Sequence, residues 1–143
     1  MRRSRAVSVQ IERPFDEVYR FLAEPLNFAQ WGPVSNERMT HVGGRDYLIE
    51  VARGELVIRF IEPNAYGVLD YWVFPQGTDP GAVTSTRLVP NEEGCELTVL
   101  WLQREGEDDV KFNSEVDWLT ADLGVLKSHA RGLSLTSLRR APR

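Results

Sequence analysis

Three charged side chains lie in segments whose alternating pattern predicts half-buried strands. Arg59, Asp70 and Arg87 each lie among apolar residues in such a segment. A charge that points into the core costs several kcal/mol unless a partner neutralises it. The pattern leaves two interpretations open. The side chains either point outward as cross-strand ion pairs, or anchor the carboxylate or carbonyl group of a bound ligand.

Residues that could act in catalysis are present, but the sequence does not pair them. General acid–base catalysis needs a titratable group within reach of the substrate. Tyr47, Asp70, Tyr71 and Arg87 are candidates by residue type. Because no paired constellation such as His–Asp is found, the sequence leaves open whether the protein is an enzyme.

The sequence contains no motif for a metal or a cofactor. There is no zinc signature, no phosphate-binding glycine motif and no nucleophile elbow. His41 and His129 stand alone, without a ligand partner at metal spacing. Cys95, the single cysteine, alternates with Leu97 and Val99, which favours a small buried side chain over a nucleophile. We therefore expect no cofactor and no metal.

Aromatic residues are numerous for a chain of 143 residues, with four Trp, four Tyr and six Phe. Most of them must fill the core, but several at inward strand positions could line a pocket for a flat or aliphatic apolar molecule. Together with the polar candidates, they form the predicted ligand-binding set: Trp31, Tyr47, Phe60, Asp70, Trp72, Phe74, Arg87, Trp101 and Leu119.

Hydrophobic periodicity predicts the elements that position these residues. Residues 6–12 alternate as a strand, and Pro14 suits the first turn of a helix over 14–23, followed by a short helical segment at 26–31. Six further strands, separated by short turns, are predicted at 37–42, 45–52, 55–62, 67–75, 82–90 and 95–104. Short connections between consecutive strands indicate an antiparallel meander.

A long helix is predicted over residues 108–131, with Asp108 as its N-cap. Its apolar residues recur every three or four positions and form one stripe. The stripe includes Phe112, Val116, Leu119, Leu123 and Leu126. One helix cannot fill the concave face of a curved seven-stranded antiparallel sheet. We therefore expect an α+β fold with a cavity under the helix and a mouth near Trp31 and the Gly43-Gly44 turn.

The first 31 residues follow an order that is typical of one superfamily. A strand ends at Ile11 and Pro14 follows; a helix then carries Phe15, Val18, Tyr19 and Phe21, and a short helix ends at Trp31. This opening resembles that of the START-like superfamily, also called SRPBCC or polyketide cyclase/dehydrase and lipid transport proteins. The segments 67–73 and 122–127 resemble an uncharacterised bacterial branch of it. The resemblance covers nearly the whole chain.

This resemblance implies a helix-grip fold, in which the sheet curves around the C-terminal helix and two short helices follow the first strand. The superfamily includes lipid carriers, cyclases and chaperone regulators, so function has to be argued from the expected cavity. That cavity leads us to expect that the protein binds a small hydrophobic ligand, such as a lipid, a polyketide-like molecule or an aromatic molecule, as a carrier or sensor. Two alternatives stay open: an enzyme of the polyketide cyclase or dehydratase type that uses a polar cavity residue, and a regulator resembling the activators of the heat-shock chaperone ATPase.

Charge and hydropathy restrict the partners. Six of the 17 basic residues lie at the two ends, so residues 6–138 carry 21 acidic and only 11 basic side chains. An acidic body argues against nucleic-acid binding. No apolar run approaches the about 20 residues of a membrane span, and no segment has the pattern of a signal peptide. We expect a cytoplasmic protein.

The domain organisation is simple. We expect a single domain over 1–143, with flexible tails at 1–5 and 134–143. Trp118, Val125 and Leu133 lie off the apolar stripe of the long helix, and the edges of a sheet need cover. These features leave a homodimer open.

Overall fold

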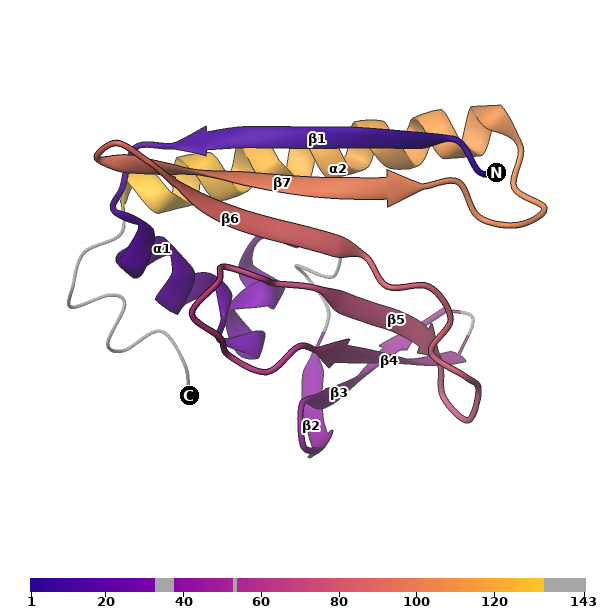
Figure 1. The fold of residues 1–143 in the computed structure, drawn as a ribbon. Helices are drawn as coiled ribbons and strands as arrows, with labels where there is room; N and C mark the ends of the chain where they lie inside the picture. Colours follow the sequence, from indigo (N-terminus) through magenta and orange to yellow (C-terminus); the bar gives the residue numbers. More distant parts are fainter. Residues whose placement is uncertain (33–37, 53, 133–143) are drawn as a thin grey trace.

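The computed structural model of the chain describes residues 1–32, 38–52 and 54–132. In these ranges the chain forms a mixed α+β fold (Figure 1). The strands are β1 (Ser4–Ile11), β2 (Met39–Gly43), β3 (Asp46–Val51), β4 (Gly54–Phe60), β5 (Tyr71–Pro75), β6 (Ser85–Asn91) and β7 (Gly94–Leu102). The helices are α1 (Phe15–Leu22), the 3₁₀ helix η1 (Pro25–Gln30) and α2 (Asp109–Arg131). Leu133 and the tail expected at 134–143 lie outside these ranges.

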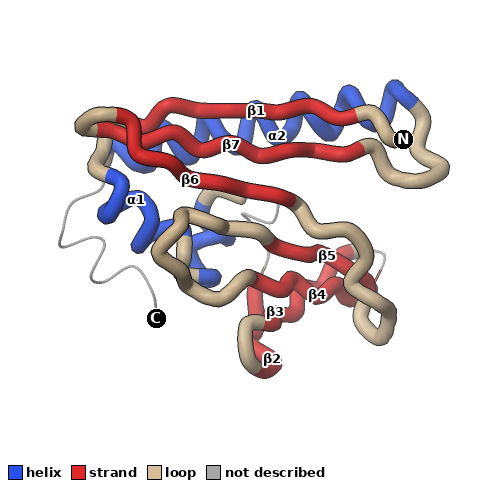
Figure 2. The backbone as a smooth tube through the Cα atoms, in the orientation of Figure 1, coloured by secondary structure: helices blue, strands red, loops and turns tan. Residues whose placement is uncertain are grey.

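The strands form two antiparallel sheets. One has the order β1-β7-β6 and the other has the order β2-β3-β4-β5, and Figure 2 shows both in red. The prediction of one continuous seven-stranded sheet is therefore wrong. Isolated bridges at Val68–Arg87 and Tyr71–Thr84 connect the two sheets. The predicted strand 67–75 thus splits into a bridged segment and β5.

A side chain interrupts the ladder at this junction. The backbone N–H of Leu69 donates to the carbonyl of Thr86 at 2.9 Å, as in a regular antiparallel pair. The N–H of Thr86, however, donates at 2.8 Å to the carboxylate Oδ1 of Asp70 and not to the carbonyl of Leu69. Sequence periodicity cannot predict that a side-chain carboxylate takes the place of a backbone carbonyl. It reports which residues are buried, and not which group a backbone N–H binds.

The long helix α2 runs along β1 and β7 (Figure 1). Asp108 is its N-cap, and its side chain accepts a hydrogen bond from the N–H of Lys111 at 2.8 Å. The predicted apolar stripe is buried, with at most 7% of each side chain exposed; it comprises Phe112, Val116, Leu119, Leu123 and Leu126. Both predictions for the helix are confirmed. No helix in the described part of the chain is long and apolar enough to cross a membrane.

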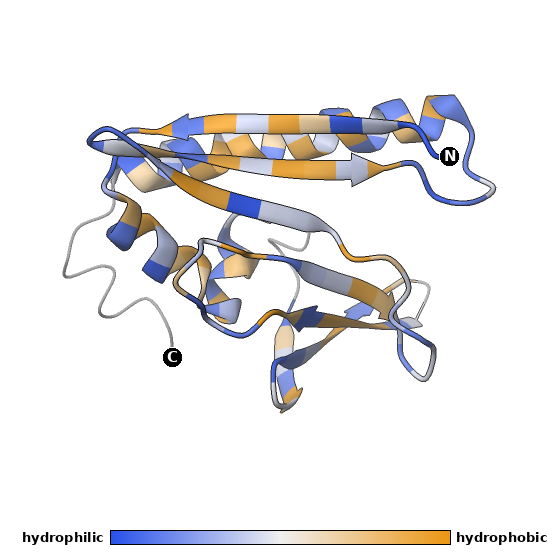
Figure 3. Ribbon diagram, in the orientation of Figure 1, coloured by the Kyte–Doolittle hydropathy of each residue, from blue (hydrophilic) through white to orange (hydrophobic). Residues whose placement is uncertain are grey.

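Figure 3 shows apolar residues alternating with polar ones along β1 and β7. In β1 this alternation buries Val7 and Ile11, because successive side chains point to opposite faces of a strand. The strand starts earlier than predicted, since Ser4 and Arg5 already pair with Leu102 and Trp101. The tail expected at 1–5 is thus partly β-strand.

The two short helices close one end of the fold. Val18 and Phe21 of α1 are buried. Asn27 of η1 is 1% exposed, and its side-chain amide donates to the carbonyl of Phe21 at 3.0 Å and accepts from Gln30 Nε2 at 2.9 Å. Both bonds satisfy a buried polar side chain, and the bond to Phe21 also links η1 to α1.

Candidate functional site

A cavity of about 560 Å³ lies between α2 and the four-stranded sheet. This volume is in the range of sites for small molecules. We call it the large cavity. One wall is the inner face of the sheet and is apolar, formed by Ile49, Val51, Leu56, Ile58 and Val73. The other wall is α2, and it contains Glu115, Trp118, Leu119 and Asp122.

The large cavity opens near the connection between β5 and β6. Its exposed lining residues include Pro75 at the end of β5, and Asp79 and Gly81 from this connection. Trp118 of α2 also lines the opening and is 65% exposed. The mouth was predicted near Trp31 and the Gly43-Gly44 turn. Neither belongs to the lining among the described residues, because η1 packs Trp31 into the core.

The half-buried carboxyl groups of the large cavity come from α2. Glu115 Oε1 accepts a hydrogen bond from Trp101 Nε1 at 3.3 Å. Burial raises the pKa of the Glu115 carboxyl, and the nearby Glu107 raises it further. Burial also raises the pKa of Asp122. Two carboxyl groups therefore face a space where the protonated form is favoured more than in water.

Tyr71 lies at the boundary of the large cavity. Its side chain is 6% exposed, and burial raises the pKa of its phenol, with a smaller contribution from the charge of Asp122. The rings of Tyr71 and Phe28 have centroids 5.2 Å apart, and both residues also line a second, smaller space. These two rings therefore separate the large cavity from the smaller one.

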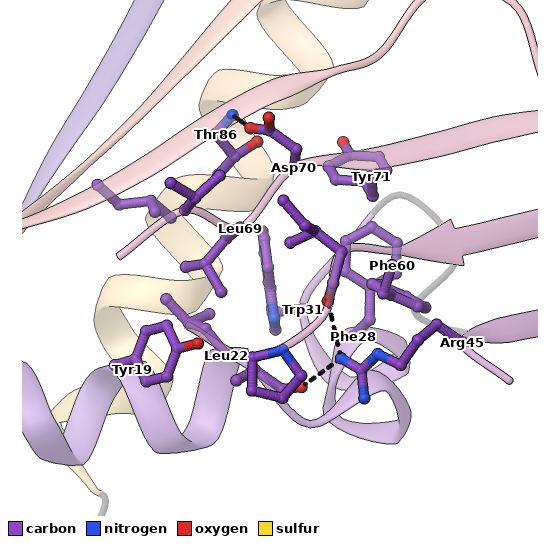
Figure 4. Close-up of a pocket in the computed structure, with 15 residues that line it drawn as sticks. Tyr19, Leu22, Phe28, Trp31, Arg45, Phe60, Leu69, Asp70, Tyr71 and Thr86 are labelled. Carbon is purple, nitrogen blue, oxygen red and sulfur yellow. Dashed lines mark hydrogen bonds between the residues drawn. The ribbon is translucent and has the colours of Figure 1, made fainter. Parts of the chain in front are cut away.

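The smaller space has a volume of about 30 Å³, enough for a single water, and is shown in Figure 4. Arg45 Nη2 donates to the carbonyls of Ala23 and Ile61, both at 3.2 Å. Arg45 Nε and Thr86 Oγ1 are buried without a hydrogen-bond partner among the described residues. A bound water is the simplest partner for either group.

The structure distributes the nine predicted ligand-binding residues over three regions. The large cavity is lined by Phe74, Trp101 and Leu119. The smaller space is lined by Trp31, Phe60 and Asp70. Neither space is lined by Tyr47, Trp72 or Arg87.

Strand register explains why the last three residues lie elsewhere. Trp72 pairs with Arg59, and both lie on the face of the sheet opposite to Ile58 and Val73. Arg87 is exposed in β6. Tyr47 shares the inner face, but it packs between His41 and Phe60, with ring centroids 5.0 and 5.8 Å away, respectively. The charged side chain of Arg59 points outward, where it pairs with Asp46 at 2.7 Å.

Sequence reasoning missed the two carboxylates of α2. Glu115 and Asp122 are seven residues apart and flank the stripe formed by Val116, Leu119 and Leu123. Acidic residues that flank a stripe are usually assigned to solvent. One feature of the sequence could have identified these two residues. They lie on a helix that is expected to cover the unfilled concave face of a sheet, so side chains beside its apolar stripe can reach that space.

The side chains around the large cavity offer apolar surface for contact and carboxyl groups that can take up and release protons. Cys95 is buried, and burial raises the pKa of its thiol to about 11, so a thiolate is disfavoured. Within the described ranges, no three His, Cys, Asp or Glu side chains are placed to hold a metal ion. Glu115 and Asp122 are the titratable groups that face the large cavity from its helix wall.

No protein-family model matches the sequence, and no curated protein matches it either. Solved structures do share the fold. An uncharacterised protein from Bacillus thuringiensis is similar with a TM-score of 0.69 and 12% identity, over 90% of this chain and 99% of that chain. The Aha1 dimer from Colwellia psychrerythraea gives a TM-score of 0.64 and 12% identity, over 93% of this chain and 97% of that one.

A third structure, DynU16, is encoded in the dynemicin biosynthetic locus. It matches with a TM-score of 0.67 and 18% identity, over 90% of this chain but only 47% of the longer DynU16 chain. At these identities the comparisons define a fold class, a sheet framework with a long C-terminal helix. Function has to be argued from the cavity.

Proposed function

We propose that the protein is a member of the START-like superfamily that binds a small hydrophobic molecule in the large cavity, as a carrier or sensor in the cytoplasm. The single observation that carries this proposal is the cavity of about 560 Å³ with an apolar sheet wall. Natural cores are close-packed, and few of their voids exceed a water molecule. A space of this size is therefore better explained by a ligand than by imperfect packing.

The binding energy should come mainly from apolar contact. Ile58 and Val73 offer side chains fixed on strands, so the apolar wall is preformed and little reorganisation opposes binding. Burial of apolar area contributes roughly 25 cal/mol per Å². A lipid, a polyketide-like molecule or an aromatic molecule would fit this chemistry.

A fluorescence titration tests the proposal. Nile red, a neutral hydrophobic dye, should bind saturably at one site and quench the emission of the cavity residues Trp101 and Trp118. Val73→Trp should fill the cavity and weaken binding at least about tenfold, which is about 1.4 kcal/mol. Val89→Trp, at an exposed position of β6, is the control and should bind like the wild type.

Two results would overturn the proposal. One is the absence of a saturable response to Nile red. The other is unchanged binding by both Val73→Trp and a second cavity-filling variant, Leu56→Trp, when melting curves show that both variants are folded. Two filling variants are needed because insertion of a large side chain can itself destabilise a domain by about 1–3 kcal/mol.

An enzyme of the cyclase or dehydratase type is the second candidate. The observation that favours it is the raised pKa of Glu115 and Asp122 inside an apolar space, because perturbed carboxyl groups often serve as general acids or bases. Turnover of a polyketide-like substrate that is lost in both Glu115→Gln and Asp122→Asn would favour this candidate over a carrier.

The regulator candidate rests on the likeness to the Aha1 dimer. A homodimer of this chain would be consistent with the exposure of Trp118 and Val125 on α2, at 65% and 51%. A mass from light scattering of twice the chain mass of 16.3 kDa would support a homodimer. A mass equal to that of one chain at high protein concentration would exclude the homodimer.

A further inference from the structure

The charged side chains that line the large cavity differ in their exposure. Arg2, Asp79 and Arg104 are exposed, so solvent screens their charges in part, although the charge of Arg104 still acts to lower the pKa of Glu115. The half-buried charged residues of the lining are Glu115 and Asp122, and both are acidic. The charge that a bound ligand meets away from water is therefore negative.

Glu115 and Asp122 both lie on the helix wall. Their separation of seven residues corresponds to two turns of α2, or about 10 Å along the axis. Leu119 lies between them and is 7% exposed. The two carboxylates thus face the same space from one helix and stand opposite the apolar wall of the sheet.

The two carboxylates differ in their partners. Glu115 already accepts a hydrogen bond from Trp101 Nε1, and the guanidinium of Arg104 lies 5.7 Å from the centroid of the Trp101 ring. Asp122 makes no hydrogen bond and no ion pair with any residue that the structure describes. Its oxygens are not among the buried atoms that lack a partner, so water reaches them in the free protein. A ligand that covers this carboxylate is bound unfavourably unless it supplies a compensating charge or donor.

The surroundings of Asp122 suit a cation. Tyr71 is close enough to respond to its charge, and Figure 4 shows the Tyr71 hydroxyl pointing away from the smaller space. Trp118, four residues before Asp122, exposes 65% of its side chain in the lining. Aromatic faces attract ammonium groups, and a desolvated carboxylate adds a direct ion pair.

From this arrangement we propose that the ligand is an apolar molecule that carries a cationic amine. The ammonium group lies at Asp122, and the apolar body lies along the sheet wall at Ile58 and Val73. This inference rests on the ligand binding proposed above and adds the chemical class of the ligand. It also excludes fatty acids and other apolar carboxylates as preferred ligands, because like charges on the helix wall repel them.

Three probes of equal chain length test the inference by displacement of Nile red; the two charged probes are kept below their micelle concentrations and the neutral one below its solubility limit. Dodecyltrimethylammonium carries a positive charge, dodecanol is neutral and dodecanoate carries a negative charge. We expect the cation to bind at least about tenfold more tightly than dodecanol, as for a charged hydrogen-bonded or ionic contact, and dodecanoate to bind most weakly.

Two isosteric variants locate the effect. Asp122→Asn should reduce the affinity for the cation about tenfold and leave the affinity for dodecanol unchanged. Asp117→Asn, on an exposed position of the same helix that does not line the large cavity, should change neither affinity. Both substitutions remove one negative charge, so a general effect of net charge would appear in both.

The outcomes separate this inference from the proposed function. Equal affinity for the three probes, or tightest binding of dodecanoate, would overturn the amine proposal and leave a hydrophobic carrier in place. An equal loss of cation binding in Asp122→Asn and Asp117→Asn would overturn the role of Asp122. If Nile red binds but none of the probes displaces it, the amine proposal fails and a carrier of another hydrophobic molecule stays in place; if Nile red itself does not bind, both proposals fail.

Discussion

Asp70 Oδ1 accepts a hydrogen bond from the backbone N–H of Thr86 at 2.8 Å. The carboxylate replaces the carbonyl of Leu69, which would accept this bond in a continuous antiparallel ladder. The bond is one of several that join the four-stranded sheet to the three-stranded one, beside the backbone bonds that Thr84 makes with Tyr71. Beyond the bridge between Tyr71 and Thr84, the end of β5 and the residues just before Thr84 line the large cavity, and no further bridge joins them in the described part of the chain.

Loss of this carboxylate should weaken the connection between the sheets. Asp70→Ala leaves the N–H of Thr86, a residue with 5% exposure, without its acceptor. We expect it to lower the free energy of unfolding by about 1–3 kcal/mol in urea titrations. Asp70→Asn keeps an acceptor oxygen and should cost less. Similar stability of Asp70→Ala and the wild type would show that the bond does not hold the junction.

Gly67 supports the same junction through its backbone. Its φ is +71°, and a Cβ at this position would lie 2.1 Å from the carbonyl oxygen of Leu88. Gly67→Ala should therefore destabilise the protein by more than about 1 kcal/mol. Gly124→Ala in α2, where a Cβ meets nothing within 4 Å, should instead stabilise it by about 0.5–1 kcal/mol. The melting temperatures of the two variants test these opposite expectations, and equal shifts in melting temperature would contradict them.

The apolar stripe of α2 should dominate its contribution to stability. Leu123 is 2% exposed, so Leu123→Ala should cost about 2–5 kcal/mol. Val125→Ala, two residues further on and 51% exposed, should change stability by no more than about 0.5 kcal/mol. Comparable losses in both variants would mean that the helix is covered on its outer side as well.

The pH dependence of stability should show the cost of a carboxylate in the large cavity. Burial raises the pKa of Asp122 above its ordinary value of 3.8, so the folded state binds this proton more tightly than the unfolded state does. Stability is therefore lost as pH rises from the ordinary pKa to the raised one, and it stays lower above that interval.

Asp122→Asn removes this loss. We expect the variant to melt at a higher temperature than the wild type at pH 7 and at nearly the same temperature at pH 3, in calorimetric scans without ligand. Asp117→Asn, on the exposed side of α2, serves as the control and should not show this pattern. A lower melting temperature for Asp122→Asn at pH 7 would indicate that its carboxylate is stabilised by a contact within the protein.

The sequence was sufficient to predict the buried side of those elements that have one apolar face and one polar face. In α2 the spacing of Phe112, Val116 and Leu123 identified the buried side, and in β1 Val7 and Ile11 did the same. Local spacing was enough in both cases because the buried face repeats with the period of the element.

The inner face of the four-stranded sheet could not be derived in this way. In β4 the neighbouring residues Val57 and Ile58 are 6% and 0% exposed, although they point to opposite faces. Alternation therefore carries no information about which face lines a cavity, and for the strand that contains Trp72 it leaves the choice of face open. The role of Asp70 as a backbone acceptor depends on a residue 16 positions away, which no local pattern encodes.

Methyl NMR spectroscopy of the protein during titration with Nile red is the most direct measurement of ligand binding in the large cavity. We expect saturable shifts for the methyl groups of Ile58, Val73 and Leu119, which line the cavity, and none for Val42 or Val89, which are exposed outside it. Saturable shifts at Val42 or Val89 without shifts at Ile58 and Val73, or no saturable shift at all, would contradict the account.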